Sequence, residues 1–294
     1  MSNHISPMHT PVMPEEVISL MNINPYGKYV DGTCGLGGHS RLIQNKLSKE
    51  GLLISLDIDQ KAIIECKNSL NKKKSGLHIE KSSYSNLPNI LEGLGINKVD
   101  GILLDLGLSS MQLDSDERGF SFRKDSYLDM RFDQESQLSA SDIINKSSEF
   151  ELANIIYNYG EERRSRSIAS RIIKNRPIIN VQDLVSAIKK STPPHKRNKT
   201  MARVFQALRI AVNKELDRLS DFLSKYIEYL EKGGKIIIIS FHSLEDRLVK
   251  RNFKNYSNSG FLKILTKKPM VANDFERRSN SRSKSAKLRC AEKI

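Results

Sequence analysis

Short apolar runs alternate with segments of helical spacing in the first third of the chain. The apolar runs, each predicted as a strand, are residues 29–31, 52–57, 77–80 and 99–106. The segments between them that show helical spacing are residues 40–47, 60–70 and 86–94. Because strands and helices that alternate at this pitch form βαβ units, the pattern predicts a parallel sheet.

This alternation stops near Met111. Up to about residue 200 the chain is polar and charged, with helical patches at residues 140–144, 150–157, 167–173 and 184–188. A long helix is then predicted over 202–230, ended by Gly233-Gly234 and followed by a strongly apolar strand over 235–241. We therefore expect an α/β core, residues 1–113 and 202–294, interrupted by a helical insertion, residues 114–201.

The C-terminal segment combines two short strand-like stretches, residues 262–265 and 286–290, with many cations. After Leu244 there are fourteen Lys or Arg residues and five Asp or Glu residues. The whole chain carries a formal net charge of +14, with a pI near 9.6. Such a field attracts polyanions, so nucleic acid is the expected partner, although a Lys-rich composition by itself produces the same charge.

The cysteines and the apolar segments exclude several classes of protein. Cys34, Cys66 and Cys290 lie far apart, without a CxxC pair or a histidine at ligand spacing, so we expect neither a metal site nor a disulfide framework. The longest apolar run is far below a membrane span, and residues 1–10 contain no signal-peptide core. The expected location is the cytoplasm, with no membrane partner.

Glycines and two carboxylates occupy strand ends. Asp31-Gly-Thr-Cys-Gly-Leu-Gly-Gly-His39 follows the first strand, and several glycines on such a turn let a ligand approach the backbone. A tight turn explains them equally well. The spacing is neither GxGxxG nor a phosphate-binding GxxxxGK[ST], which argues against NAD and ATP. Asp57 ends the second strand, where an acid can accept both hydroxyls of a ribose, so the expected ligand is an adenosine derivative.

A second polar group follows the fourth strand. Asp105, the hydroxyls of Ser109 and Ser110, and the amide of Gln112 leave the sheet together, beside the expected ligand crevice. An N-cap and a turn are the alternative explanation for these residues. So much hydrogen-bonding capacity at a sheet end favours contact with a ligand.

Together with further motifs, these residues resemble the bacterial 16S rRNA cytosine-N4-methyltransferase family, RsmH or MraW. The matching motifs are His9-Thr-Pro-Val, Asp31-Gly-Thr-Cys-Gly-Leu-Gly-Gly-His-Ser40, Asp105-Leu-Gly-Leu-Ser-Ser-Met-Gln-Leu-Asp114, Arg118-Gly-Phe-Ser-Phe122, Leu128-Asp-Met-Arg131, Tyr159-Gly-Glu-Glu-Arg163, Phe205-Gln-Ala-Leu-Arg-Ile210, Ser240-Phe-His-Ser-Leu-Glu-Asp-Arg247 and Ser285-Ala-Lys-Leu-Arg289. They extend through nearly the whole chain, and several are too long to match by chance.

The resemblance implies a class I S-adenosylmethionine-dependent methyltransferase, with a Rossmann-like α/β sheet and an inserted helical domain for RNA recognition. The implied substrate is a decoding-centre cytosine of 16S rRNA in the small ribosomal subunit. The implied contacts of S-adenosylmethionine are Gly37, Gly38, His39, Asp57, Tyr84, Asp105 and Gln112. Only the resemblance points to Tyr84, whose ring could stack on adenine.

Two segments depart from the family pattern. The family usually has His-Pro-Ala-Thr-Arg where this chain has Lys199-Thr-Met-Ala-Arg203. Near the C-terminus, its Asn-Pro-Arg-Ala-Arg-Ser is replaced within Ser279-Asn-Ser-Arg-Ser-Lys-Ser285. Both segments are expected on the RNA side, so the departures concern the grip on the substrate.

The catalytic candidates are Asp105, Ser109 and Ser110. Asp105 could accept an N–H of the target amine, or it could bind the amino acid end of the cofactor and leave the amine to Ser109, Ser110 or a backbone carbonyl. The sequence does not separate these roles. His242, at the end of the most apolar strand, could line the pocket, although a structural hydrogen bond is the more common role for such a histidine.

Cations and rings past the fourth strand suit an unstacked RNA base. The predicted RNA contacts are Arg118, Phe120, Phe122, Arg131, Lys284 and Arg289. Arg163, Arg164, Arg166 and Arg171 could reach phosphates, although a solvated helix face explains them equally well. Two rival interpretations are a non-enzymatic RNA-binding protein on the same scaffold and a methyltransferase that acts on DNA or protein.

Overall fold

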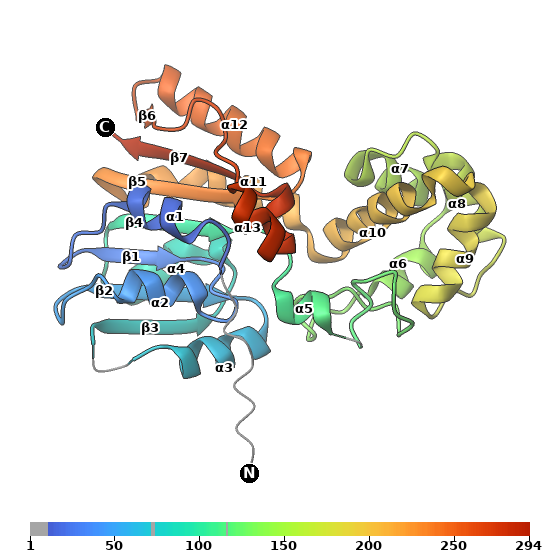
Figure 1. Ribbon diagram of the computed structural model, residues 1–294, viewed down its shortest axis with the longest axis horizontal. Helices are drawn as coiled ribbons and strands as arrows, with labels where there is room; N and C mark the ends of the chain where they lie inside the picture. Colours follow the sequence, from blue (N-terminus) through green and yellow to red (C-terminus); the bar gives the residue numbers. More distant parts are fainter. Residues whose placement is uncertain (1–10, 72–73, 116) are drawn as a thin grey trace, which may run out of the picture. The chain divides into compact units, whose positions relative to one another are not determined.

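The chain consists of two compact units that are connected twice. The computed structural model describes residues 11–71, 74–115 and 117–294, so His9 and Thr10 of the first motif lie outside the described residues. The first unit runs to Gly107 and resumes at Leu216, and the second comprises Leu108–Glu215. Figure 1 labels the elements of both units.

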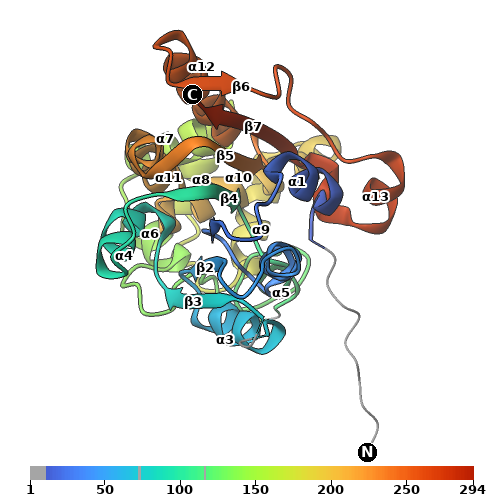
Figure 2. The same ribbon diagram turned by 90° about the vertical axis from the view of Figure 1, so that its left-hand side faces the viewer.

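A seven-stranded sheet forms the centre of the first unit. Its order is β3-β2-β1-β4-β5-β7-β6, which can be followed by the labels in Figure 1, and Figure 2 shows the same sheet turned by 90°. The strands are β1 (Lys28–Asp31), β2 (Leu52–Asp57), β3 (Gly76–Lys81), β4 (Val99–Asp105), β5 (Leu230–Ser240), β6 (Leu262–Ile264) and β7 (Lys287–Lys293). Strands β1 to β5 pair in parallel, whereas β7 is antiparallel to both β5 and β6. The predicted α/β class with a Rossmann-like sheet is confirmed.

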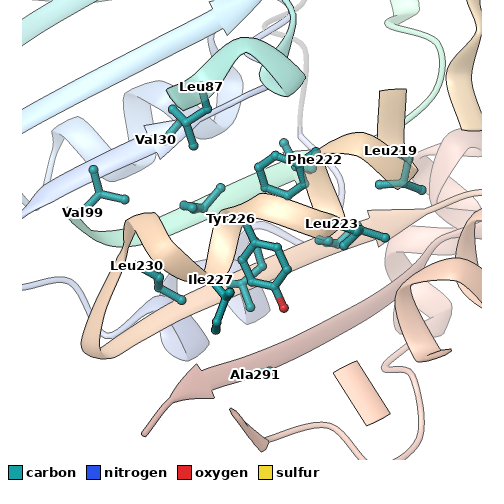
Figure 3. Close-up of a cluster of buried hydrophobic side chains, with 14 of the residues drawn as sticks. Val30, Leu87, Val99, Leu219, Phe222, Leu223, Tyr226, Ile227, Leu230 and Ala291 are labelled. Atoms are coloured by element: carbon teal, nitrogen blue, oxygen red, sulfur yellow. The ribbon is translucent and has the colours of Figure 1, made fainter. Parts of the chain in front are cut away.

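Helices cover both faces of this sheet, so its central strands are buried on both sides. Ile236 and Ile238 of β5 belong to one apolar cluster, and Ile237 between them belongs to the other. The first cluster, part of which is drawn in Figure 3, includes side chains of α4 (Leu87–Gly93), α11 (Glu215–Lys225) and α12 (Ser243–Asn258). The second includes α1 (Pro14–Met21), α2 (Gly38–Gln44) and α3 (Gln60–Ser69).

The long helix predicted over 202–230 is wrong. In its place, α10 (Arg197–Asn213) ends where Lys214 adopts a left-handed conformation with φ 49°, and α11 begins at Glu215. A short 3₁₀ turn, Tyr226–Tyr229, leads directly into β5. The predicted stop at Gly233-Gly234 is also wrong, since both glycines lie inside β5. They accompany a shift of its pairing register with β4, and a Cβ on Gly234 would lie 3.1 Å from the Asp100 carbonyl oxygen.

The second unit is helical. It contains α5 (Ser110–Asp114), α6 (Ala140–Lys146), α7 (Glu149–Gly160), α8 (Ser165–Ile173), α9 (Val181–Ser191) and α10. The four helical patches predicted from spacing fall within α6, α7, α8 and α9. Helix α7 packs against α8 and α10, and a Cβ on Gly160 would lie 2.6 Å from the Arg203 carbonyl oxygen. This contact explains why α7 ends in glycine.

Within the part of the chain that the structure describes, no helix has both the length and the apolar character needed to cross a membrane. Cys34, Cys66 and Cys290 are free, buried thiols.

Candidate functional site

The glycine-rich turn joins β1 to α2 at the carboxyl edge of the parallel strands. Gly35 and Gly37 have positive φ angles of 51° and 80°, which favour glycine. A Cβ on Gly37 would lie 2.0 Å from the Ser69 Oγ of α3, and one on Gly32 would lie 2.5 Å from the Leu104 Cδ2 of β4. These glycines are therefore required for packing the turn against its own fold, whatever ligand approaches it.

Buried hydrogen bonds fix this turn. The Ser40 hydroxyl donates to Asp31 Oδ2 over 2.6 Å, and the Asp105 backbone N–H donates to Thr33 Oγ1 over 2.6 Å. Burial raises the pKa of Asp31 to about 7, although hydrogen bonds from Ser40 and Thr33 act in the opposite direction. In the sequence, Asp31 stood out only as the first residue of the glycine-rich motif. A carboxylate in an otherwise apolar strand was the available signal for its buried position.

The raised pKa of Asp31 makes a prediction for stability. Between its ordinary pKa of 3.8 and about 7, the folded chain retains a proton that the unfolded chain has lost. The free energy of unfolding should therefore fall by about 4 kcal/mol as the pH rises through this window. In Asp31→Asn this contribution is absent, so denaturant titrations between about pH 5 and about pH 8 should show a flatter dependence. Identical pH dependence in both proteins would contradict the prediction.

Asp57 closes the turn from β2. Its Oδ2 accepts the Gly35 N–H over 2.9 Å, and its Oδ1 accepts the Asp59 N–H over 2.9 Å. Each carboxylate oxygen has a second lone pair, so both can still accept a ligand hydroxyl. Burial raises the pKa of Asp57 to about 6, with the Asp59 and Gly35 N–H groups opposing it.

Tyr84 lies in the 3₁₀ turn after β3, where its partly buried ring meets Phe222 edge-on at 5.6 Å between centroids.

Asp105, His39 and Arg282 come together at the end of β4. Asp105 Oδ2 lies 3.3 Å from Arg282 Nη2 and 3.9 Å from His39 Nε2. The Arg282 guanidinium lies over the Phe241 ring, 5.2 Å from its centroid. From the sequence, the segment that contains Arg282 was expected on the RNA side, and Arg282 was not predicted as a neighbour of Asp105. A separation of 177 residues from Asp105 left no local signal.

This group contains a buried polar atom that is suited to a ligand. Within the described residues, Asp105 Oδ1 has no hydrogen-bond partner, while the buried His39 ring interacts with the Val12 backbone. The His39 side chain is 5% exposed and that of Asp105 is 9% exposed. Burial lowers the pKa of His39, while the Asp105 carboxylate acts in the opposite direction. Since unpaired buried polar groups are costly, a bound polar molecule is the natural partner for this oxygen.

The remaining candidates from the fourth-strand motif belong to the second unit. Ser109 caps α5: its Oγ accepts the Gln112 N–H over 3.2 Å, while Gln112 Oε1 accepts the Ser109 N–H over 3.0 Å. The structure thus gives Ser109 and Gln112 the N-cap arrangement that was the alternative explanation for them. Ser110 is the first residue of α5.

Two predicted RNA-binding arginines are engaged inside the second unit. Arg118 is buried and donates to the backbone oxygens of Arg131 and Phe132. Arg131 forms two hydrogen bonds to the Asp129 carboxylate, of 2.8 and 2.9 Å. Such contacts stabilise the fold of this unit. The Phe120 ring packs on Phe132, with centroids 5.7 Å apart.

Phe122 and the altered segment of α10 also make contacts within this unit. The Phe122 ring meets Phe205 at 5.5 Å between centroids. In the altered segment Lys199–Arg203, the Thr200 hydroxyl lies 3.2 Å and the Arg203 Nη1 lies 3.4 Å from Glu162 Oε2. The contacts that the structure shows for this segment are therefore internal.

The C-terminal cations differ from one another. Lys284 is exposed, whereas Arg289 is 6% exposed and its Nε lies 2.7 Å from Asp246 Oδ1. Arg289 therefore holds β7 to the start of α12.

His242 is the N-cap of α12, where its Nδ1 accepts the Glu245 N–H over 3.4 Å. This contact is the structural hydrogen bond that the sequence favoured for His242.

The α/β sheet, the glycine turn after β1 and the carboxylates that end β2 and β4 define a Rossmann-like fold of the methyltransferase class. The model of the MraW methylase family matches residues 6–294, and the chain belongs to this family. The ribosomal RNA small subunit methyltransferase H of Caldicellulosiruptor saccharolyticus is 47% identical over an alignment of 305 positions, which covers 97% of this chain and 99% of that protein.

Other similar proteins carry related names. The ribosomal RNA small subunit methyltransferase H of a Nostoc species is 48% identical over 290 residues, covering 97% of this chain and 92% of its own. The solved structure of an rRNA methylase from Streptococcus thermophilus aligns over 98% of this chain and 99% of its own, with 10% identity and a TM-score of 0.43.

Proposed function

We propose that this protein transfers a methyl group from S-adenosylmethionine to the N4 amine of a decoding-centre cytosine of 16S rRNA. The observation that carries the proposal is the end of β4, where Asp105 presents a buried, unpartnered oxygen next to His39. Membership of a methylase family supports methyl transfer, and the names of the relatives support ribosomal RNA of the small subunit as the substrate.

The residues of the first unit fit this cofactor. S-adenosylmethionine supplies an electrophilic methyl group on a positively charged sulfonium. Beyond the effect of burial, the charges of Asp105 and Asp57 both raise the pKa of Asp31, so these carboxylates lie near one another and favour a cationic ligand. We assign the ribose hydroxyls to Asp57, the adenine ring to Tyr84, and the close backbone approach to Gly37, Gly38 and His39. Gln112 is retained as a cofactor contact on the family resemblance.

The chemistry requires an acceptor for the target amine. The lone pair of a cytosine amine is delocalised into the ring, so this nitrogen is a poor nucleophile. Asp105 Oδ1 can accept an amine N–H, which localises the lone pair and stabilises the positive charge that develops on nitrogen. Holding both reactants in line contributes about 7–11 kcal/mol to lowering the barrier. Ser109 and Ser110 are retained as further candidates for contact with the amine.

The second unit, Leu108–Glu215, is the proposed RNA-recognition domain, with wider bounds than the 114–201 expected from the sequence. Its proposed phosphate contacts are Arg163, Arg166 and Arg171, because all three are exposed around α8. Phe122 is kept as a stacking candidate because it is only partly buried. Lys284 is kept as a cation of the first unit. Arg118, Arg131 and Arg289 are better explained by their internal partners.

A transfer assay tests the proposed function. Purified protein is incubated with radiolabelled S-adenosylmethionine and naked 16S rRNA, small ribosomal subunits, DNA or protein, and the modified nucleoside is identified by mass spectrometry. We expect label in rRNA or small subunits, as N4-methylcytidine. Label only in DNA or protein, or methylation at another atom, would overturn the proposed substrate.

The same assay tests the RNA surface. Transfer to rRNA should fall as salt rises, because each phosphate contact contributes about −0.7 to the slope of log affinity against log salt for single strands. Replacing Arg163, Arg166 and Arg171 together by Gln should flatten this dependence and leave S-adenosylhomocysteine affinity unchanged. An unchanged slope would mean that these arginines are only solvated.

A further inference from the structure

Acidic residues gather at the carboxyl edge of the parallel strands. Asp31, Asp57 and Asp105 end β1, β2 and β4, and the charges of Asp57 and Asp105 both disfavour ionisation of Asp31. The charges of Asp57 and Asp105 attract the sulfonium and the ammonium group of the proposed methyl donor. They repel its α-carboxylate, which is part of the same molecule. A ligand of this kind needs a local cation beside that carboxylate.

Arg282 is placed to supply this cation. It lies in the short 3₁₀ turn Ser281–Ser285 before β7, and its side chain is 14% exposed. The Phe241 ring beneath its guanidinium and Asp105 beside it fix its position. A guanidinium has five N–H donors, and within the described residues Asp105 accepts from one of them. The others can serve a bidentate anion.

The position of Arg282 favours a small ligand at the sheet edge over an RNA phosphate. Its charge acts on His39, the second residue of α2, together with Asp105. Arg277, Arg278 and Lys284 in the same C-terminal segment are exposed, as expected for cations that meet a polyanion at the surface. Arg282 is instead held against a ring and a buried carboxylate.

We propose that Arg282 binds the α-carboxylate of the methyl donor while it holds Asp105 in place, with Asp105 Oδ1 left open. This inference rests on the proposed function. It gives a residue of the C-terminal segment a role in specificity. Arg282 would recognise the carboxylate that distinguishes the amino acid group of the methyl donor from a simple amine.

A thermodynamic cycle between protein and ligand tests the assignment. Calorimetry compares S-adenosylhomocysteine with its decarboxylated analogue, the 3-aminopropyl thioether of 5′-deoxyadenosine, which lacks only the carboxylate. The wild-type protein should bind S-adenosylhomocysteine about tenfold or more tightly than the analogue, because a charge-assisted hydrogen bond is lost. In Arg282→Gln the two ligands should bind within about twofold of each other. The contact between the guanidinium and the carboxylate is already absent from this variant, so removing the carboxylate from the ligand has no further effect on it.

Two further variants keep the test decisive if Arg282→Gln is less stable. Arg282→Lys retains the cation and should retain part of the preference for the carboxylate. Arg278→Gln removes one exposed positive charge from the same segment and should keep the full preference. Thermal unfolding without ligand reports whether each variant is folded.

Equal weakening of both ligands in Arg282→Gln would overturn the proposal, because it would mean that Arg282 supports only the fold or Asp105. If Arg282→Gln lost affinity for rRNA but kept the preference for S-adenosylhomocysteine over the analogue, Arg282 would be a contact of an RNA phosphate instead. If the wild-type protein bound neither ligand, the proposed function itself would fail.

Discussion

Asp105→Asn should lower the single-turnover rate of methyl transfer about a hundredfold or more at saturating S-adenosylmethionine. The substitution keeps the shape of the side chain and removes the charge that stabilises the developing positive charge on nitrogen. Affinity for substrate RNA should change little, because that charge appears only in the transition state. Rapid-quench measurements over a range of cofactor concentrations provide the rate at saturation.

The same experiment separates the two roles that the sequence leaves open for Asp105. If the wild-type rate were recovered at high S-adenosylmethionine, Asp105 would be a binding residue only. Since Asp105→Asn also deprives Arg282 of its counter-ion, thermal unfolding of the variant should be measured alongside. A matched control is Asp100→Asn, which removes a carboxylate from the opposite end of the same strand and should leave the rate unchanged.

Asp57→Ala should weaken S-adenosylhomocysteine binding more than a hundredfold, equivalent to about 3 kcal/mol. Two charge-assisted hydrogen bonds from the ribose hydroxyls are lost, each contributing about 1.5–3 kcal/mol. Titration calorimetry measures the change directly. In the wild-type protein the affinity should also decline as the pH falls through about 6, where the unliganded Asp57 gains a proton.

A loop defect must be distinguished from a lost ligand contact, because Asp57 also accepts the Gly35 and Asp59 N–H groups. Asp57→Asn keeps one oxygen acceptor and should lose less affinity than Asp57→Ala. Asp59→Asn alters the neighbouring carboxylate, which caps α3 through the Lys61 N–H, and should leave the affinity within a few-fold of wild type. Equal losses in Asp57→Ala and Asp59→Asn would assign the effect to the loop.

Most strands of the sheet, and the acidic residues at its edge, were predictable from local sequence. A parallel strand that is buried on both faces must be a continuous apolar run, so β1, β2, β4 and β5 were recognisable from a few adjacent residues. The carboxylates that end β1, β2 and β4 were visible for the same local reason. The boundary between α10 and α11 was not, because a helical pattern continues past Lys214 while the backbone there turns left-handed.

Which charges are available to a ligand and which stabilise the fold depends on contacts between residues far apart in the sequence. The sequence shows that Arg118, Arg131, Arg282 and Arg289 are cations, but it does not show what lies beside each one. The fold places backbone oxygens beside Arg118 and carboxylates beside Arg131 and Arg289, and it brings Arg282 to Asp105. The physical reason is that a charge interacts with whatever lies within a few ångströms of it, and chain folding sets those neighbours across large separations in sequence.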